Sequence, residues 1–246
     1  MPMYKMMIVL SFCVNTVLAQ KNITSQNIYW LRYYNQLSIG KSLVWHNEIE
    51  DRRFFEGNIQ HHLIMHSHLH YKFDPDMDAA LGLTYSLQSP HDPNALTRLT
   101  VPEIRTFQEF SLTNPVNKRL SLLHRFRLDE RFIHKNNGIE LLEGRDFNFR
   151  FRYRFQINYT LTKPEAKSPI IAKLSDELMV NAGSNIVYNY FDQNRVYVGA
   201  ELGLSKHLAA ELGYVWWFQQ RSAGNQYFDR NIIRLTVLHR LKLGSE

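Results

Sequence analysis

The stretch FNFRFRYRFQINYTL, residues 147–161, decides how this chain should be interpreted. Apolar or aromatic residues occupy every odd position from Phe147 to Leu161, and polar residues, three of them arginines, occupy every even position between them. Because side chains of a β-strand point alternately to opposite faces, this pattern predicts one long strand with an apolar face and a cationic face. Such a strand is typical of a wall between lipid and water. The alternative is a long hairpin in a soluble β-sandwich, with the aromatic rings in the core and the arginines in solvent.

The same alternation recurs along the rest of the chain, and no helical periodicity competes with it. Weaker segments cover 26–38, 41–53, 102–113 and 170–181, and the clearer ones are 59–73, 81–87, 120–128, 147–161, 196–204, 208–218 and 233–243. These make eleven segments. Bacterial single-chain membrane barrels normally have an even number of strands. We therefore expect 12 strands, with 10 as the alternative, and expect a missing strand within 21–27 or 183–190.

The connections between these segments alternate in length. Short ones fall near Gly40 and at 74–76, 114–117, 163–169 and 205–206, and long polar ones fall at 88–101, 134–146, 182–194 and 219–231. Outer-membrane barrels have short periplasmic turns and longer extracellular loops. This alternation of short and long connections therefore favours an antiparallel transmembrane β-barrel over a soluble meander.

The first nineteen residues are expected to be a signal peptide. Lys5 precedes the apolar run 6–14, and Val17-Leu18-Ala19 supplies a cleavage site before Gln20. The run is too short to cross a bilayer as a helix. The single cysteine, Cys13, lies within it, so the exported chain would form no disulfide, as suits a Gram-negative envelope. Residues 20–246 are then expected to form one barrel domain.

The net charge of +6 does not indicate a nucleic-acid partner. The basic residues alternate with other residue types and are spread among acids, whereas nucleic-acid proteins gather them in a patch or tract. The expected partners are outer-membrane lipid and lipopolysaccharide, together with the outer-membrane assembly machinery. The sequence indicates no cofactor and does not identify a small-molecule ligand.

The inward faces carry two groups of candidate functional residues. The first is a ladder of arginines on two neighbouring strands, with glutamates on another strand as candidate partners: Arg125, Arg127, Arg131, Arg150, Arg152, Arg154, Glu48 and Glu50. One interpretation is a lumen that attracts phosphate or carboxylate groups. The other is a structural network of ion pairs that fills a narrow barrel.

The second group consists of histidines that share one face of one strand: His62, His66, His68 and His70. Two imidazoles in an H-x-H pair can lean toward one Zn²⁺ or Cu²⁺. A third ligand could come from the preceding strand: His46, Glu48 or Glu50. The alternative is a polar stripe in the lumen whose histidines bond to neighbouring charges.

No catalytic residue is predicted. Ser67 and His124 fall on the lipid-facing side, and Ser121 faces inward without a fixed histidine partner. No G-x-S-x-G, H-E-x-x-H or phosphate-loop motif occurs. The preferred function is a structural protein or a narrow, largely plugged pore. Two alternatives stay open: an outer-membrane lipid-modifying enzyme, of the deacylase or phospholipase type, with an active site at the rim, and a soluble periplasmic binder.

Several short stretches also resemble a known family. These are LHRFRLDER at 123–131, Asp176-Glu177, FDQNRVYVG at 191–199 and ELGY at 211–214. They are similar to the domain-of-unknown-function 2490 family, over about residues 28–243. The resemblance implies a bacterial outer-membrane β-barrel and brings no catalytic residues with it.

Overall fold

The computed structural model describes residues 21–163 and 166–243, so the predicted signal peptide lies outside the described residues. This part of the chain forms eleven strands and one short 3₁₀ helix, η1 (Glu56–Asn58). The strands are β1 (Asn22–Ile39), β2 (Leu43–Phe54), β3 (Gln60–Asp74), β4 (Met77–Gln88), β5 (Val101–Pro115), β6 (Leu120–Asn136), β7 (Leu141–Thr160), β8 (Ile170–Ala182), β9 (Phe191–Gly203), β10 (Leu208–Gln220) and β11 (Gln226–Leu243). Within the described ranges, no helix is long and apolar enough to cross a bilayer.

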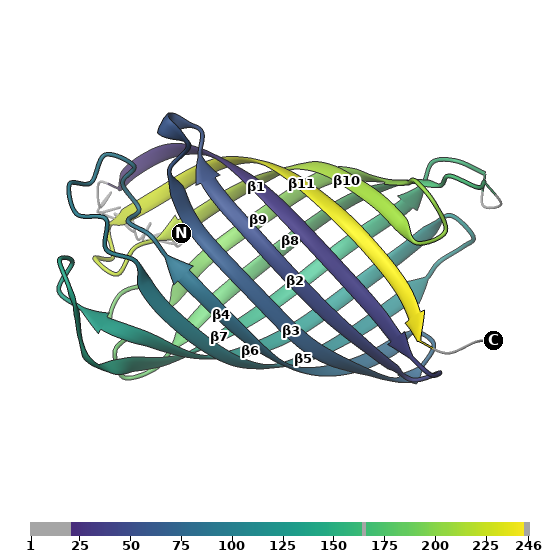
Figure 1. The fold of residues 1–246 in the computed structure, drawn as a ribbon, viewed down its shortest axis with the longest axis horizontal. Helices are drawn as coiled ribbons and strands as arrows, with labels where there is room; N and C mark the ends of the chain where they lie inside the picture. The colour runs from purple at the N-terminus through teal and green to yellow at the C-terminus, as the bar shows by residue number, and fades with distance from the viewer. Residues whose placement is uncertain (1–20, 164–165, 244–246) are drawn as a thin grey trace, which may run out of the picture.

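The strands close into a single barrel (Figure 1). Each strand pairs antiparallel with its neighbours in sequence, and the ring is closed by β1 and β11, which run parallel from Asn22 beside Gln226 to Ile39 beside Leu243. A ring of antiparallel pairs alone needs an even number of strands, and one parallel pair removes that requirement. The predicted number of 12 is therefore wrong, and so is the alternative of 10. Residues 22–27 are the first part of β1 and do not form a separate strand, and 183–190 form the connection from β8 to β9.

We call the two ends of the barrel the turn end and the loop end. The turn end carries the connections 40–42, 75–76, 116–119, 161–169 and 204–207, and the loop end carries 55–59, 89–100, 137–140, 183–190 and 221–225. Two predicted long loops, 134–146 and 219–231, are much shorter than expected, because the flanking strands continue into them. Strand pairing uses backbone groups, so polar side chains at strand ends do not stop it.

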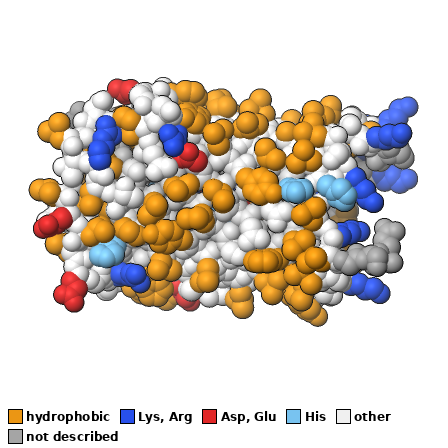
Figure 2. All heavy atoms as spheres, viewed as in Figure 1, with side chains coloured by type: hydrophobic (Ala, Val, Ile, Leu, Met, Phe, Trp, Pro, Cys, Tyr) orange, Lys and Arg blue, Asp and Glu red, His pale blue; other side chains and the backbone are white. Residues whose placement is uncertain are grey.

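The two faces of the wall differ as the alternation predicts. On β7, Phe151 is 51% exposed on the outside, whereas its neighbour Arg150 is 6% exposed and faces the lumen. Figure 2 shows hydrophobic side chains spread over the outer wall and basic side chains gathered at the turn end, on the right. The charged face of the predicted strand is thus the inner face of the barrel.

His61 is the exception to this alternation. Its position predicts an outward side chain, yet it is fully buried. The register between β2 and β3 shifts here, with Arg53 beside Gln60 and Arg52 beside His62, so His61 is left as an extra residue. Such an irregularity turns a side chain to the other face. The ring packs edge-on against Phe54 and Trp217, at 5.1 and 5.8 Å between centroids.

Part of the lumen near the loop end is filled by an apolar cluster. Its members come from both sides of the parallel pair and from the strands beside it: Ile28, Trp30, Phe54, Tyr197, Val215, Trp217 and Ile232. Guanidinium groups cover the indole rings, with Arg52 at 4.0 Å from the Trp30 ring and Arg230 at 4.3 Å from the Trp217 ring. This packing holds buried arginines against aromatic faces.

Tyr197 lies flat over two glycines that face each other across β9 and β10. Gly199 and Gly213 are register partners, and a Cβ added to either would come within 2.6 Å of Tyr197 Cζ. Gly213→Ala should therefore displace the ring and lower the free energy of unfolding by about 1–3 kcal/mol. Guanidinium unfolding followed by tryptophan fluorescence measures the change. Tyr197→Leu should recover part of the loss in the double variant, and strictly additive effects would contradict the contact.

Candidate functional site

The predicted charge ladder and both glutamates line the narrowest part of the lumen, which we call the constriction. Its cavity has a volume of about 130 Å³. Arg125 stands beside Arg154 and Arg127 beside Arg152 in the register of β6 and β7, as adjacent strands require. Among the described residues that line this cavity, eleven are arginines and three are glutamates. The space is therefore narrow, polar and rich in positive charge.

A carboxylate from β8 stabilises the arginine ladder. Glu177 accepts hydrogen bonds from Arg152, with Nη2 2.8 Å from Oε1, and from Arg125. Asp129 accepts from Arg127 Nε at 2.9 Å and lies 3.5 Å from Arg152 Nη1. These side chains are almost completely removed from solvent, so each charge depends on the others for compensation.

Glu48 and Glu50 lie at the constriction but pair with arginines outside the predicted ladder. Arg32 Nη2 lies 2.5 Å from Glu48 Oε2 and Arg52 Nε 2.9 Å from Glu50 Oε2. The last ladder residue, Arg131, donates to Glu103 at 2.5 Å. The sequence analysis missed Arg32 and Arg52 as members of the network. Both arginines lie at inward positions, in strands where the alternation of apolar and polar residues is weak.

Two inward arginines have few partners. Arg154 and Arg195 each leave Nε without a hydrogen-bond partner, and no ion pair of either was found among the described residues. Arg195 instead lies over the Trp217 ring at 4.6 Å. The constriction thus keeps a positive excess that its own carboxylates do not cancel.

The connection between β4 and β5 covers the lumen at the loop end. Gln26 Nε2 donates to the His91 carbonyl at 2.6 Å, and Asn94 Nδ2 donates to Glu56 Oε1 at 3.1 Å. Burial, together with the positive charges of Arg230 and Arg221, lowers the pKa of His91 to about 3. His91 is therefore neutral at physiological pH and packs beside the buried guanidinium group of Arg230 without adding charge.

At the turn end the lumen widens into a cavity of about 970 Å³, which we call the vestibule. Lysines and histidines of the turn end, among them Lys72, Lys206 and His207, line its outer part. Arg32, Arg125 and Arg154 line both cavities and so mark the boundary with the constriction. The vestibule gives solutes access to the inner wall from the turn end.

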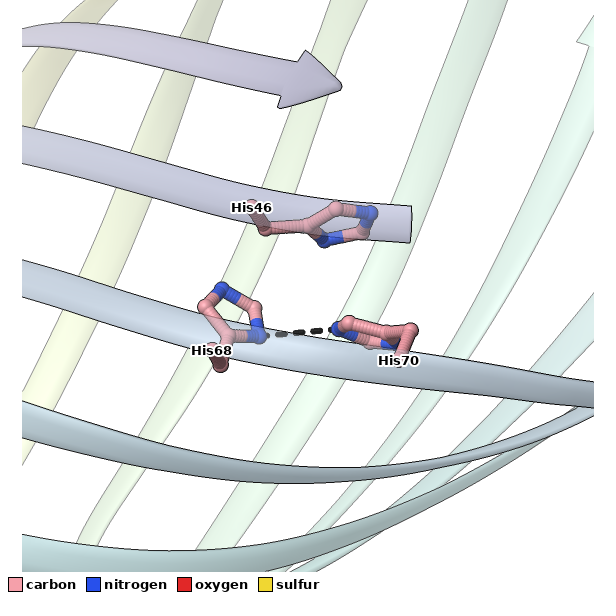
Figure 3. Close-up of side chains that lie close together, drawn as sticks. All are labelled: His46, His68 and His70. Carbon is pink, nitrogen blue, oxygen red and sulfur yellow. Dashed lines mark hydrogen bonds between the residues drawn. The ribbon is translucent and has the colours of Figure 1, made fainter. Parts of the chain in front are cut away.

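The four predicted histidines do not form one group. His62 and His66 line the constriction, whereas His68 and His70 line the vestibule. His46 of β2, named as a candidate third ligand, is the register partner of His68 and lines the vestibule too. His46, His68 and His70, shown in Figure 3, form one cluster with ring nitrogens within 4.8 Å of one another, and Glu48, Glu50 and His66 form a second such cluster.

The residues considered for acyl transfer are engaged elsewhere. Ser67 accepts from Trp45 Nε1 at 2.9 Å and donates to Asn47 Oδ1 at 3.0 Å on the outer face. His124 bonds to the Tyr153 hydroxyl at 2.8 Å, and Ser121 accepts from Asn158 at 3.3 Å. These three residues do not form the Ser–His pair that the enzyme hypothesis requires.

Fold and lumen together define a closed β-barrel protein with a network of ion pairs at its constriction. The chain belongs to the family described as Protein of unknown function (DUF2490), whose family model matches residues 27–228. The resemblance seen in the short motifs is thereby confirmed. No match to the chain was found among curated proteins.

Glu177 provides a test of the network. Glu177→Gln leaves Arg125 and Arg152 without their shared charge partner inside the lumen. Breaking a buried ion pair on one side should cost about 3–5 kcal/mol in the free energy of unfolding. Glu140→Gln, in the exposed turn between β6 and β7, is the matched control and should change it by less than about 0.5 kcal/mol. Equal denaturation midpoints for the two variants would show that the network does not stabilise the fold.

Proposed function

We propose that this chain is an outer-membrane β-barrel protein of a Gram-negative bacterium, exported by a cleaved signal peptide. In this proposal the turn end faces the periplasm and the loop end faces outside. The protein acts as a structural element or as a narrow, largely plugged pore. Outer-membrane lipid and lipopolysaccharide would contact its wall, and the outer-membrane assembly machinery would insert it.

The observation that carries the proposal is that apolar side chains cover the outside of the barrel and charged side chains line its inside. A soluble barrel buries its apolar side chains inside and exposes its polar ones. Here Leu81, Leu212 and Phe151 are 67, 60 and 51% exposed on the outer wall, while arginines and glutamates fill the interior. A continuous exposed apolar surface of this extent requires an apolar environment. The soluble periplasmic binder is therefore disfavoured.

Strand length supports the same environment. The shortest strands in the described chain, β2 and β4, have 12 residues, and β7 has 20. A tilted transmembrane strand needs about 9–11 residues to cross the hydrocarbon core. Every strand is thus long enough to cross and to extend into the headgroup regions. The closed wall also leaves no unpaired edge in lipid.

The filled lumen supports the plugged state. Arg125 and Arg152 both donate to Glu177 from neighbouring strands, and all three side chains project into the constriction. General porins, which conduct freely, have about 16–18 strands and a much wider lumen. A barrel of this size with paired charges in its centre is suited to a closed or very narrow pathway.

The membrane location is tested by one substitution on each face of β7. Phe151→Arg places a charge in the proposed lipid, which costs about 2–4 kcal/mol near the bilayer midplane. Gln156→Arg places the same residue in the water-filled vestibule and should be tolerated. In membrane fractions, the wild type and Gln156→Arg should migrate differently on gels before and after boiling, and Phe151→Arg should not. Full recovery of the wild type in the periplasmic fraction would overturn the proposal.

Conductance tests the plugged lumen. Purified wild-type protein in planar bilayers should show little or no steady current, with at most a weak anion preference from the arginine excess. The double variant Arg154→Ala and Arg195→Ala should widen the constriction, and neither substitution removes an arginine that pairs with a carboxylate in the described residues. Its current should therefore be larger. Large, stable steps from the wild type would show that the lumen is open.

A further inference from the structure

We propose that His46, His68 and His70 bind a divalent first-row transition ion, such as Zn²⁺ or Cu²⁺, on the wall of the vestibule. We call these three residues the histidine triad. The proposed membrane location is not needed for this site, since it rests on contacts between β2, β3 and β4.

The wall brings the three rings together from two adjacent strands. His46 stands beside His68 in the register of β2 and β3, and His70 follows His68 on the same face. The rings of His46 and His70 are stacked at 4.0 Å between centroids, and His68 Nδ1 lies 2.8 Å from His70 Nε2 (Figure 3). One ring nitrogen of each histidine lies within 4.8 Å of the others. This convergence does not depend on a flexible loop.

Two of the three rings are held by a carboxylate at the nitrogen that is not turned toward the other histidine of β3, and His46 is held by neutral side chains. Asp78 of β4 bonds to His70 Nδ1 at 2.5 Å, and the Tyr34 hydroxyl bonds to His46 Nδ1 at 2.7 Å. Glu48 lies 3.3 Å from His68 Nε2. Histidines that bind metals almost always bond through the second nitrogen to a carboxylate or similar group, which orients the ring and raises its basicity. His68 and His70 have such a partner, whereas His46 is oriented by Tyr34 at Nδ1 and lies 3.4 Å from Gln36 Nε2 through its own Nε2.

The nitrogen atoms need only small shifts to accept an ion. Zinc binds histidine nitrogen at about 2.0–2.1 Å in tetrahedral geometry, which separates neighbouring nitrogens by about 3.4 Å. His68 Nδ1 and His70 Nε2, now 2.8 Å apart, would open slightly, and the wider separations of up to 4.8 Å would close. Imidazole ligands select zinc, copper and nickel over magnesium or calcium. Three histidines leave a fourth position for water or an exchangeable ligand.

Access and charge also suit a cation. The triad is only 5–8% exposed, but all three side chains line the vestibule of about 970 Å³, through which a hydrated ion can enter. The carboxylate of Asp78, which also lines the vestibule, brings a negative charge to the site. The ion would thus be partly neutralised by a group that also orients a ligand.

The experiment uses the whole chain, folded in detergent, freed of any affinity tag and stripped with EDTA. Isothermal titration with ZnCl₂ should give a saturable site in the wild type. His68→Gln and His46→Gln should abolish it, and Asp78→Asn should weaken it about 10–100-fold. His207→Gln is the matched control, because His207 also lines the vestibule but belongs to neither histidine-containing cluster, and it should bind zinc like the wild type.

Cu²⁺ provides a readout that does not depend on comparing variants. Its electron paramagnetic resonance spectrum in the wild type should show coupling to several nitrogen nuclei, as expected for imidazole ligands. The difference in gel migration before and after boiling confirms that each variant is folded. No zinc uptake by the folded wild type, or an equal loss of binding in His207→Gln, would overturn the proposal.

Discussion

The barrel is closed by the pairing of β1 with β11. Eighteen residues of each strand take part in this pairing. Without this pairing the wall would be a sheet with two long unpaired edges, each a template for association with another chain. Once the edges meet, the alternate side chains of every strand have only two places to lie. One is the outer surface and the other is a lumen of fixed width.

The width of that lumen decides what the arginines can do. Long cationic side chains from β6 and β7 reach the middle of the barrel, where they meet the Glu177 carboxylate of β8 and the Asp129 carboxylate of β6 itself. In a wider barrel such side chains would line a channel and remain hydrated. Here they replace water in the centre, while the vestibule stays open at the turn end. One chain thus contains a packed middle and an accessible inner wall.

Much of this arrangement could be predicted from the sequence, because a period of two directly reports which face a side chain occupies. The strand containing Phe151 and Arg152 and the inward histidines follow from it. The number of strands could not be derived, since parity depends on whether the closing pair is parallel. The partners of Glu48 and Glu50 could not be derived either, because which inward charges meet depends on register across several strands. The inward orientation of His61 could not be predicted, because a register shift turns a side chain to the other face without changing the alternation of apolar and polar residues.

The parallel closing pair also limits how this chain could be rearranged. β1 starts at the loop end and β11 finishes at the turn end, so Asn22 and Leu243 lie at opposite ends of the barrel (Figure 1). In a barrel with an even number of strands, the two ends lie at one rim, and a short linker could join them to create a circular permutant. Here such a linker would have to run the full height of the wall. The constriction blocks the lumen, and in the proposed membrane the outer wall faces lipid. In that setting the linker could cross only as an additional antiparallel strand between β11 and β1.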